Sequence, residues 1–126
     1  MKLVITASLK ETEYEPLRKK VTLEILKKAA RKSLEGLGDN IKNSKKITGT
    51  LLNKIYLTTP GGAARVVFLI QISENQSVLV MIRLKNDKKV GSNMTVDNPR
   101  FRAILEKNLD SILRDLNLGM YEVYEV

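Results

Sequence analysis

The stretch RVVFLIQISENQSVLVMIRLKNDKK, residues 65–89, decides the fold, because it contains two apolar runs joined by a short polar turn. The runs at 64–73 and 77–85 are rich in valine, isoleucine and leucine, and they predict the two strands of an antiparallel β-hairpin. Both runs are apolar on both faces over much of their length. We therefore expect these strands to lie centrally in a sheet that is covered by helices.

The segments before the hairpin predict two further strands. Residues 53–59, NKIYLTT, form a strand that a TPGGA turn connects to the hairpin, so three consecutive strands make an antiparallel meander. Residues 2–9 alternate between apolar and polar side chains, which is typical of a strand. Residues 41–52 are compatible with either a short helix or a basic loop.

Two segments have helical periodicity. From Pro16 to Leu37 the apolar residues recur on one broad face, and the acidic residues just before the proline suit a helix N-terminus. A second helix begins at Asn98-Pro99, which is a cap signal, and Gly119 ends it. The final YEVYEV, residues 121–126, is compatible with an edge strand.

The chain is therefore expected to form one α+β domain over residues 1–126. In this domain an antiparallel meander sheet is packed by one or two N-terminal helices. Residues 98–126 add a C-terminal helix and the final edge strand.

The composition excludes several classes of site. The chain has no cysteine and no histidine, so it cannot form a disulfide, a Ser-His-Asp or Cys-His triad, or a conventional zinc site. We expect neither a metal nor another cofactor. No apolar run approaches the roughly 20 residues of a membrane helix, so we expect no membrane contact and a cytoplasmic location.

The charge is distributed unevenly. The chain has 22 basic and 14 acidic residues, a net charge of +8, and eleven basic residues against three acidic ones lie between Arg18 and Lys54. This asymmetry indicates a polyanionic partner, although a solvated lysine-rich surface would also explain it. The candidate RNA-binding residues are Lys20, Lys27, Arg31, Lys45, Lys46, Lys88 and Lys89.

A second group of polar side chains lies on the predicted sheet. The candidate catalytic residues are Lys54, Tyr56, Arg65, Arg83 and Lys85. Lys54 and Tyr56 are two residues apart in a strand and share a face, as do Arg83 and Lys85. Whether Arg65 joins their face depends on the register of the hairpin turn, which the sequence leaves open.

Cations on a rigid sheet suit phosphate chemistry. They can bind a nucleic-acid backbone, or they can stabilise the extra negative charge of a pentacoordinate phosphate. RNA carries its own nucleophile in the 2′-hydroxyl. A ribonuclease without a metal therefore needs positioning, charge stabilisation and proton transfer, for which lysine or tyrosine could replace histidine.

The segments LLNKIYL, GGAARVVFLI and SVLVMIRLKNDKK together resemble the RelE/ParE superfamily of toxins from toxin–antitoxin modules. In that family a strand with basic residues precedes a strand of the type G-x-x-R-V-x-Y, and a buried strand then ends in a lysine-rich stretch. The order of one strand, helices and a three-stranded meander is also similar. The resemblance covers roughly residues 1–90.

The resemblance implies a small sheet with helices on one face, a basic concave surface and a cognate antitoxin partner. RelE-type members are endoribonucleases that cleave mRNA in the ribosomal A site by 2′-hydroxyl attack and so inhibit translation. On the matching positions, Arg65 and Arg83 would stabilise the phosphate, Lys54 or Lys85 would transfer protons, and Tyr56 would stack or donate. Lys54 is the basic position of its strand, Arg65 is the strand-entry arginine, and either Arg83 or Lys85 is the basic end of the last strand.

Two alternatives remain open. ParE-type members inhibit DNA gyrase through contact alone. The absence of a tyrosine or histidine soon after Lys89 favours this branch, while the density of cations on the sheet favours the RelE branch. Phe68 stands where tyrosine is common in the family, and its missing hydroxyl removes one polar contact. Outside the family, the chain could be a basic nucleic-acid-binding module without catalysis.

Overall fold

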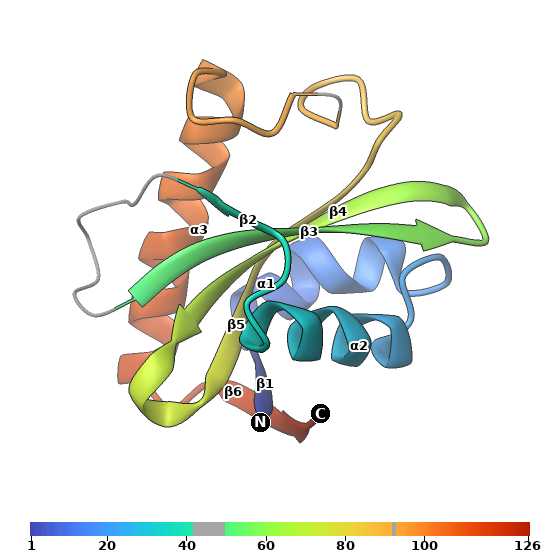
Figure 1. Ribbon diagram of the computed structural model, residues 1–126. Helices are drawn as coiled ribbons and strands as arrows, with labels where there is room; N and C mark the ends of the chain where they lie inside the picture. Colours follow the sequence, from blue (N-terminus) through green and yellow to red (C-terminus); the bar gives the residue numbers. More distant parts are fainter. Residues whose placement is uncertain (42–49, 92) are drawn as a thin grey trace.

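The computed structural model describes residues 1–41, 50–91 and 93–126, which form a six-stranded sheet between helices (Figure 1). The strands are β1 (Lys2–Thr6), β2 (Asp39–Ile41), β3 (Thr50–Thr59), β4 (Gly62–Gln71), β5 (Gln76–Leu84) and β6 (Tyr121–Glu125). The helices are α1 (Ala7–Leu9), α2 (Leu23–Leu34) and α3 (Pro99–Asn117). Single turns of π or 3-10 helix occur at Lys10–Tyr14, Glu15–Leu17 and Ile72–Glu74.

The sheet has the strand order β2-β3-β4-β5-β1-β6. The antiparallel meander of β3, β4 and β5 is confirmed, and so is the α+β class with a C-terminal helix. The sheet as a whole is mixed, because β1 lies parallel to β5. The expected final strand exists as β6 and pairs antiparallel with β1.

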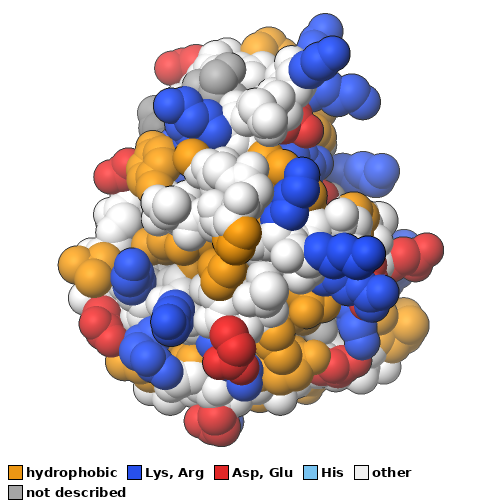
Figure 2. All heavy atoms as spheres, turned by 90° about the vertical axis from the view of Figure 1, so that its right-hand side faces the viewer, with side chains coloured by type: hydrophobic (Ala, Val, Ile, Leu, Met, Phe, Trp, Pro, Cys, Tyr) orange, Lys and Arg blue, Asp and Glu red, His pale blue; other side chains and the backbone are white. Residues whose placement is uncertain are grey.

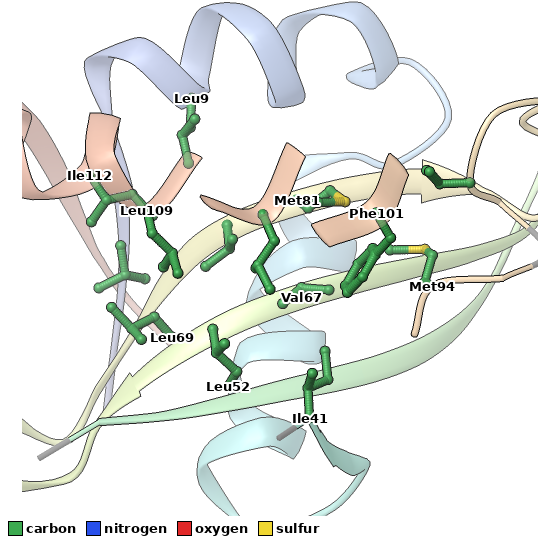
Figure 3. Close-up of a cluster of buried hydrophobic side chains, with 14 of the residues drawn as sticks. Leu9, Ile41, Leu52, Val67, Leu69, Met81, Met94, Phe101, Leu109 and Ile112 are labelled. Carbon is green, nitrogen blue, oxygen red and sulfur yellow. The ribbon is translucent and has the colours of Figure 1, made fainter. Parts of the chain in front are cut away.

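Helices cover both faces of the sheet, so the expectation of helices on one face only is wrong. On one face α2 packs Leu26, Ala29 and Ala30 against the strands. On the other face α3 packs Phe101 and Leu109, among others, against the strands (Figure 3). The physical reason is that the central strands are apolar on both faces, and each face must be removed from water.

The N-terminal boundaries differ from the prediction. The first strand ends at Thr6, and short helical turns follow as far as Leu17. The main helix begins after Thr22, whose side-chain oxygen accepts a hydrogen bond from the Ile25 N–H at 3.3 Å, and not at Pro16. In contrast, Asn98 caps α3 as predicted and accepts from the Arg100 N–H at 3.0 Å. Residues 42–49, within the segment left open between helix and loop, lie outside the described residues.

A β-bulge in β5 sets the register of the hairpin. Val67 is opposite Met81 but Phe68 is opposite Leu79, so Val80 has no partner across the ladder. This extra residue shifts the alternation of side chains by one position. As a result Val80 and Met81 both contribute to the core under α3, and Arg83 lies directly opposite Arg65.

A buried carboxylate joins α3 to the N-terminal segment. Asp115 accepts a hydrogen bond from the Ser8 N–H at 2.8 Å and is 1% exposed. Burial by itself would raise the pKa of Asp115, but the hydrogen bonds from Ser8 and the nearby Arg114 lower the pKa below its ordinary value. A carboxylate whose pKa is lower in the folded state stabilises the fold above its unfolded pKa and loses this effect as the pH falls through the folded pKa.

We therefore expect Asp115→Asn to lower the free energy of unfolding by about 2 kcal/mol at neutral pH. The variant should also lose less further stability than the wild type when the pH falls below about 4. Urea unfolding over a pH series measures both effects. Asp97→Asn, at an exposed carboxylate, is the control, and an equal acid dependence of the wild type and Asp115→Asn would contradict this role.

Candidate functional site

The register places three of the candidate catalytic residues in one row across the sheet. Tyr56 of β3 is opposite Arg65 of β4, and Arg65 is opposite Arg83 of β5. All three lie on the face that α3 covers elsewhere. Val67 and Met81, two positions from Arg65 and Arg83, and Leu52, four positions from Tyr56, belong to the core under α3. The bulge therefore decides that Arg65 and Arg83 lie on the same face of the sheet.

Tyr56 is the exposed end of this row. Its side chain is 52% exposed, although it belongs to a central part of β3. The Lys54 Nζ lies 5.4 Å and the Arg65 Cζ 5.2 Å from the centroid of its ring. These distances are those of cation–π contacts, so two positive charges flank one accessible aromatic ring.

Lys54 and Arg65 also hold the loop between β5 and α3 on the sheet. Lys54 is only 8% exposed, and its Nζ donates a hydrogen bond to the Met94 carbonyl at 3.0 Å. Arg65 donates through Nη1 to the Gly91 carbonyl. Each cation thus has an acceptor within the chain, which orients it toward Tyr56.

Arg83 has a buried partner that the sequence interpretation missed. Its Nη1 donates to the Glu13 carboxylate and, at 2.7 Å, to the Ile82 carbonyl. Glu13 is 4% exposed and also accepts from the Ile82 N–H at 2.9 Å. Asn108 donates to the Val80 carbonyl at 2.8 Å and lies 3.5 Å from the second Glu13 oxygen.

A signal for this cluster was present in the sequence. Glu13 stands four residues from both Leu9 and Leu17, which is the spacing of one helical face. A carboxylate on an apolar face requires a cation and hydrogen-bond donors. Asn108 similarly lies three residues after Leu105 on the apolar face of α3.

A groove of about 780 Å³ opens above this pair. It lies between the turn at Lys10–Tyr14, the end of β5, the loop at 86–89 and α3. Its walls include Glu13 and Arg83, and Lys88, Lys89 and Lys107 contribute positive charge to its lining. Lys88 and Lys89, two of the candidate RNA-binding residues, are exposed and border the groove.

Lys85 lies one residue beyond β5. Its backbone N–H donates to the Ala63 carbonyl at 2.8 Å, which continues the ladder, and its side chain is exposed. Because it follows Arg83 by two positions, it projects from the same face as Tyr56. We call Lys54, Tyr56, Arg65 and Lys85 together the Tyr56 surface.

The predicted basic cluster of the N-terminal helix does not join the Tyr56 surface. Lys27 is on α2, which covers the opposite face, and its Nζ lies 3.8 Å from a Glu24 oxygen and 5.8 Å from the centroid of the Tyr124 ring. Arg31 is exposed on the same helix. Lys20 lies against Gly61 at the turn between β3 and β4. Lys45 and Lys46 lie outside the described residues.

Figure 2 shows the molecule from the side of this β3–β4 turn, with more blue lysine and arginine side chains than red acidic ones. The blue side chains are spread over this side and are interrupted by orange apolar side chains. A surface that combines positive charge with accessible apolar side chains suits a nucleic acid better than a metal ion.

Within residues 1–41, 50–91 and 93–126, no group of side chains has the composition of a metal site. In the same part of the chain, no helix is both long and apolar enough to cross a membrane. Comparison with family models, curated proteins and solved structures finds no match.

The structural role of Lys54 can be separated from a binding role. We expect Lys54→Met to lower the free energy of unfolding by about 1–2 kcal/mol, because the Met94 carbonyl loses its buried donor. Lys85→Met removes an exposed cation from the same face and should change stability by less than about 0.5 kcal/mol. Urea unfolding compares the two variants, and equal stability losses would contradict the assignment.

Proposed function

We propose that this protein is a toxin of the RelE/ParE type that binds and cleaves mRNA at the ribosome in the cytoplasm. The observation that carries the proposal is the exposed ring of Tyr56 between Lys54 and Arg65. An exposed aromatic ring stacks on an unpaired base of single-stranded RNA. The cations beside the ring bind the phosphates that flank that base.

The same residues supply what metal-free RNA cleavage requires. The 2′-hydroxyl oxygen forms a bond to phosphorus, the bond from phosphorus to the 5′-oxygen breaks, and a 2′,3′-cyclic phosphate and a 5′-hydroxyl result. Arg65 and Lys54 stabilise the negative charge that develops on the nonbridging phosphate oxygens. The Tyr56 hydroxyl donates the proton to the leaving 5′-oxygen, and the 2′-hydroxyl proton passes to solvent.

The groove beside Arg83 supports the expected antitoxin partner. It combines apolar walls, such as Leu9 and Ile104, with Lys88, Lys89 and Lys107 in its lining. This combination suits an acidic amphipathic segment of a second protein. The proposal assigns the groove to the antitoxin, and the Tyr56 surface to RNA.

A second candidate function is contact inhibition of DNA gyrase, as in ParE-type members. It is favoured by one specific observation, which is that Lys54, Arg65 and Arg83 each donate to an acceptor within the chain. Cations that are held in this way contribute less to stabilising a transition state. They can still present a fixed binding surface.

The deciding experiment uses purified ribosomes and maps mRNA ends after incubation with wild type, Tyr56→Ala and Tyr56→Phe. We expect A-site cleavage by the wild type and about 5- to 150-fold slower cleavage by Tyr56→Ala, because stacking contributes about 1–3 kcal/mol per base. Tyr56→Phe keeps the ring but not the hydroxyl, so a further loss in that variant assigns proton transfer. Tyr121→Ala, at an exposed tyrosine on β6, is the matched control.

Intact mRNA in the presence of the wild type would overturn the cleavage proposal. Inhibition of DNA supercoiling in a gyrase assay would then establish the second candidate. Salt-dependent binding to free RNA that neither cleaves it nor inhibits gyrase would instead indicate a nucleic-acid-binding module.

A further inference from the structure

The strand β6 forms one edge of the sheet (Figure 1). Two hydrogen bonds define the orientation of its backbone. The Ala7 N–H donates to the Met120 carbonyl at 2.9 Å, and the Val126 N–H donates to the Met1 carbonyl at 3.2 Å. In an antiparallel ladder every second residue directs its N–H and C=O toward the neighbouring strand. Residues 120, 122, 124 and 126 therefore face β1, so Tyr121, Val123 and Glu125 direct their backbone groups away from the sheet.

This edge lacks lysine, proline and a bulge, which are features that protect an edge strand from pairing. Its charged residues are the two glutamates Glu122 and Glu125. The strand YEVYE contains neither lysine nor proline, and its register with β1 is regular over all five residues. Tyr121 and Val123 are 44% and 48% exposed on the same side of the strand. The edge thus offers free backbone groups together with apolar side chains.

We propose that β6 pairs antiparallel with β6 of a second copy of this chain, about a two-fold axis through Val123. In this register Val123 is opposite Val123 of the second copy, and Tyr121 is opposite its Glu125. All three residues have outward backbone groups, so each of the three resulting pairs exchanges two hydrogen bonds. The two sheets then continue through the interface with about six backbone hydrogen bonds.

The side chains favour this register over its neighbours. Glu122 is opposite Tyr124 and Glu125 is opposite Tyr121, so no carboxylate faces another across the interface. A shift by two residues in one direction places Glu122 opposite Glu122 of the second copy, and these like charges destabilise that register. A shift in the other direction retains only two of the three hydrogen-bonded pairs. A second copy is therefore the partner that the charge pattern of this edge fits.

Cysteine crosslinking tests the register. The chain contains no cysteine, so each variant has a single thiol. Two Val123→Cys chains would have Cα atoms about 5.5 Å apart, within the range for a disulfide. Two Tyr121→Cys chains would have these atoms about 14 Å apart, because residue 121 is four positions from its own copy. We expect oxidation to crosslink Val123→Cys into a dimer and to leave Tyr121→Cys as single chains.

Sedimentation over a concentration series tests the association of the wild type. We expect a monomer–dimer equilibrium, and Val123→Pro should weaken it at least about tenfold because it removes two symmetry-related hydrogen bonds. The Val123 N–H does not bond β1, so this proline sits where an edge strand tolerates it. A monomeric wild type at every concentration, or equal crosslinking of both cysteine variants, would overturn the proposal. If Val123→Pro fails to fold, the pair of cysteine variants still decides it.

Discussion

Replacing Glu13 with glutamine is expected to lower the free energy of unfolding by about 3–5 kcal/mol. The carboxylate is 4% exposed and bonds both the Arg83 guanidinium and the Ile82 N–H. When the Glu13 charge is removed, Arg83 loses this counter-ion. The guanidinium remains largely buried, because only 19% of the Arg83 side chain is exposed. The loss would be a large share of the about 5–15 kcal/mol that stabilises a typical domain.

Urea unfolding at neutral pH measures this effect. The matched control is Glu24→Gln, because Glu24 also pairs with a cation but is 80% exposed, and we expect it to cost about 0.5 kcal/mol or less. Glu13→Leu combined with Arg83→Met removes both charges and should recover part of the lost stability. A loss below about 1 kcal/mol for Glu13→Gln would contradict the structural role of this pair.

Replacing Gly91 with alanine is expected to cost about 3 kcal/mol of stability and to weaken the RNA binding proposed above. A Cβ atom at this position would lie 2.2 Å from the Leu84 carbonyl oxygen and 2.7 Å from the Asp87 backbone nitrogen. Both are backbone atoms, so the loop after β5 would have to open. The Gly91 carbonyl would then leave Arg65, which loses one of the contacts that orient it beside Tyr56.

Gly61→Ala is the matched control for this change. Its added Cβ would meet only the side chain of Lys20, which is flexible and can move aside. We expect a cost below about 1 kcal/mol for this variant. Urea unfolding and RNA binding are measured for both, and equal behaviour of the two alanine variants would argue against a tightly packed loop at Gly91.

Parts of the fold follow from local patterns. The meander is readable because three apolar runs are separated by short turns, and α3 is readable because its apolar residues and its Asn98 cap agree. The structure of the N-terminal segment cannot be predicted from such local patterns. The periodicity from Pro16 onward does not distinguish a continuous helix from short turns. The contact between Glu13 and Arg83 joins residues that are 70 positions apart in the chain.

The candidate site likewise has features that the sequence predicts and features that it does not. The shared face of Lys54 and Tyr56 follows from the two-residue period of a strand, and the contact between them agrees with it. The acceptors of Lys54 and Arg65 are carbonyls of a loop, and any residue type could supply them. No sequence pattern identifies a backbone acceptor that is brought near by tertiary packing.

By itself, the sequence determined the identity of the central strands, the basic character of the chain and the absence of histidine and cysteine chemistry, since these depend on composition and on short periods. Only the tertiary structure decided that Arg83 faces Arg65 and that β6 leaves an open edge. A single unpaired residue, Val80, moves every following side chain of β5 to the other face, and strand order depends on which distant segments pair. Local patterns carry no information on either, because both are properties of contacts between residues far apart in the chain.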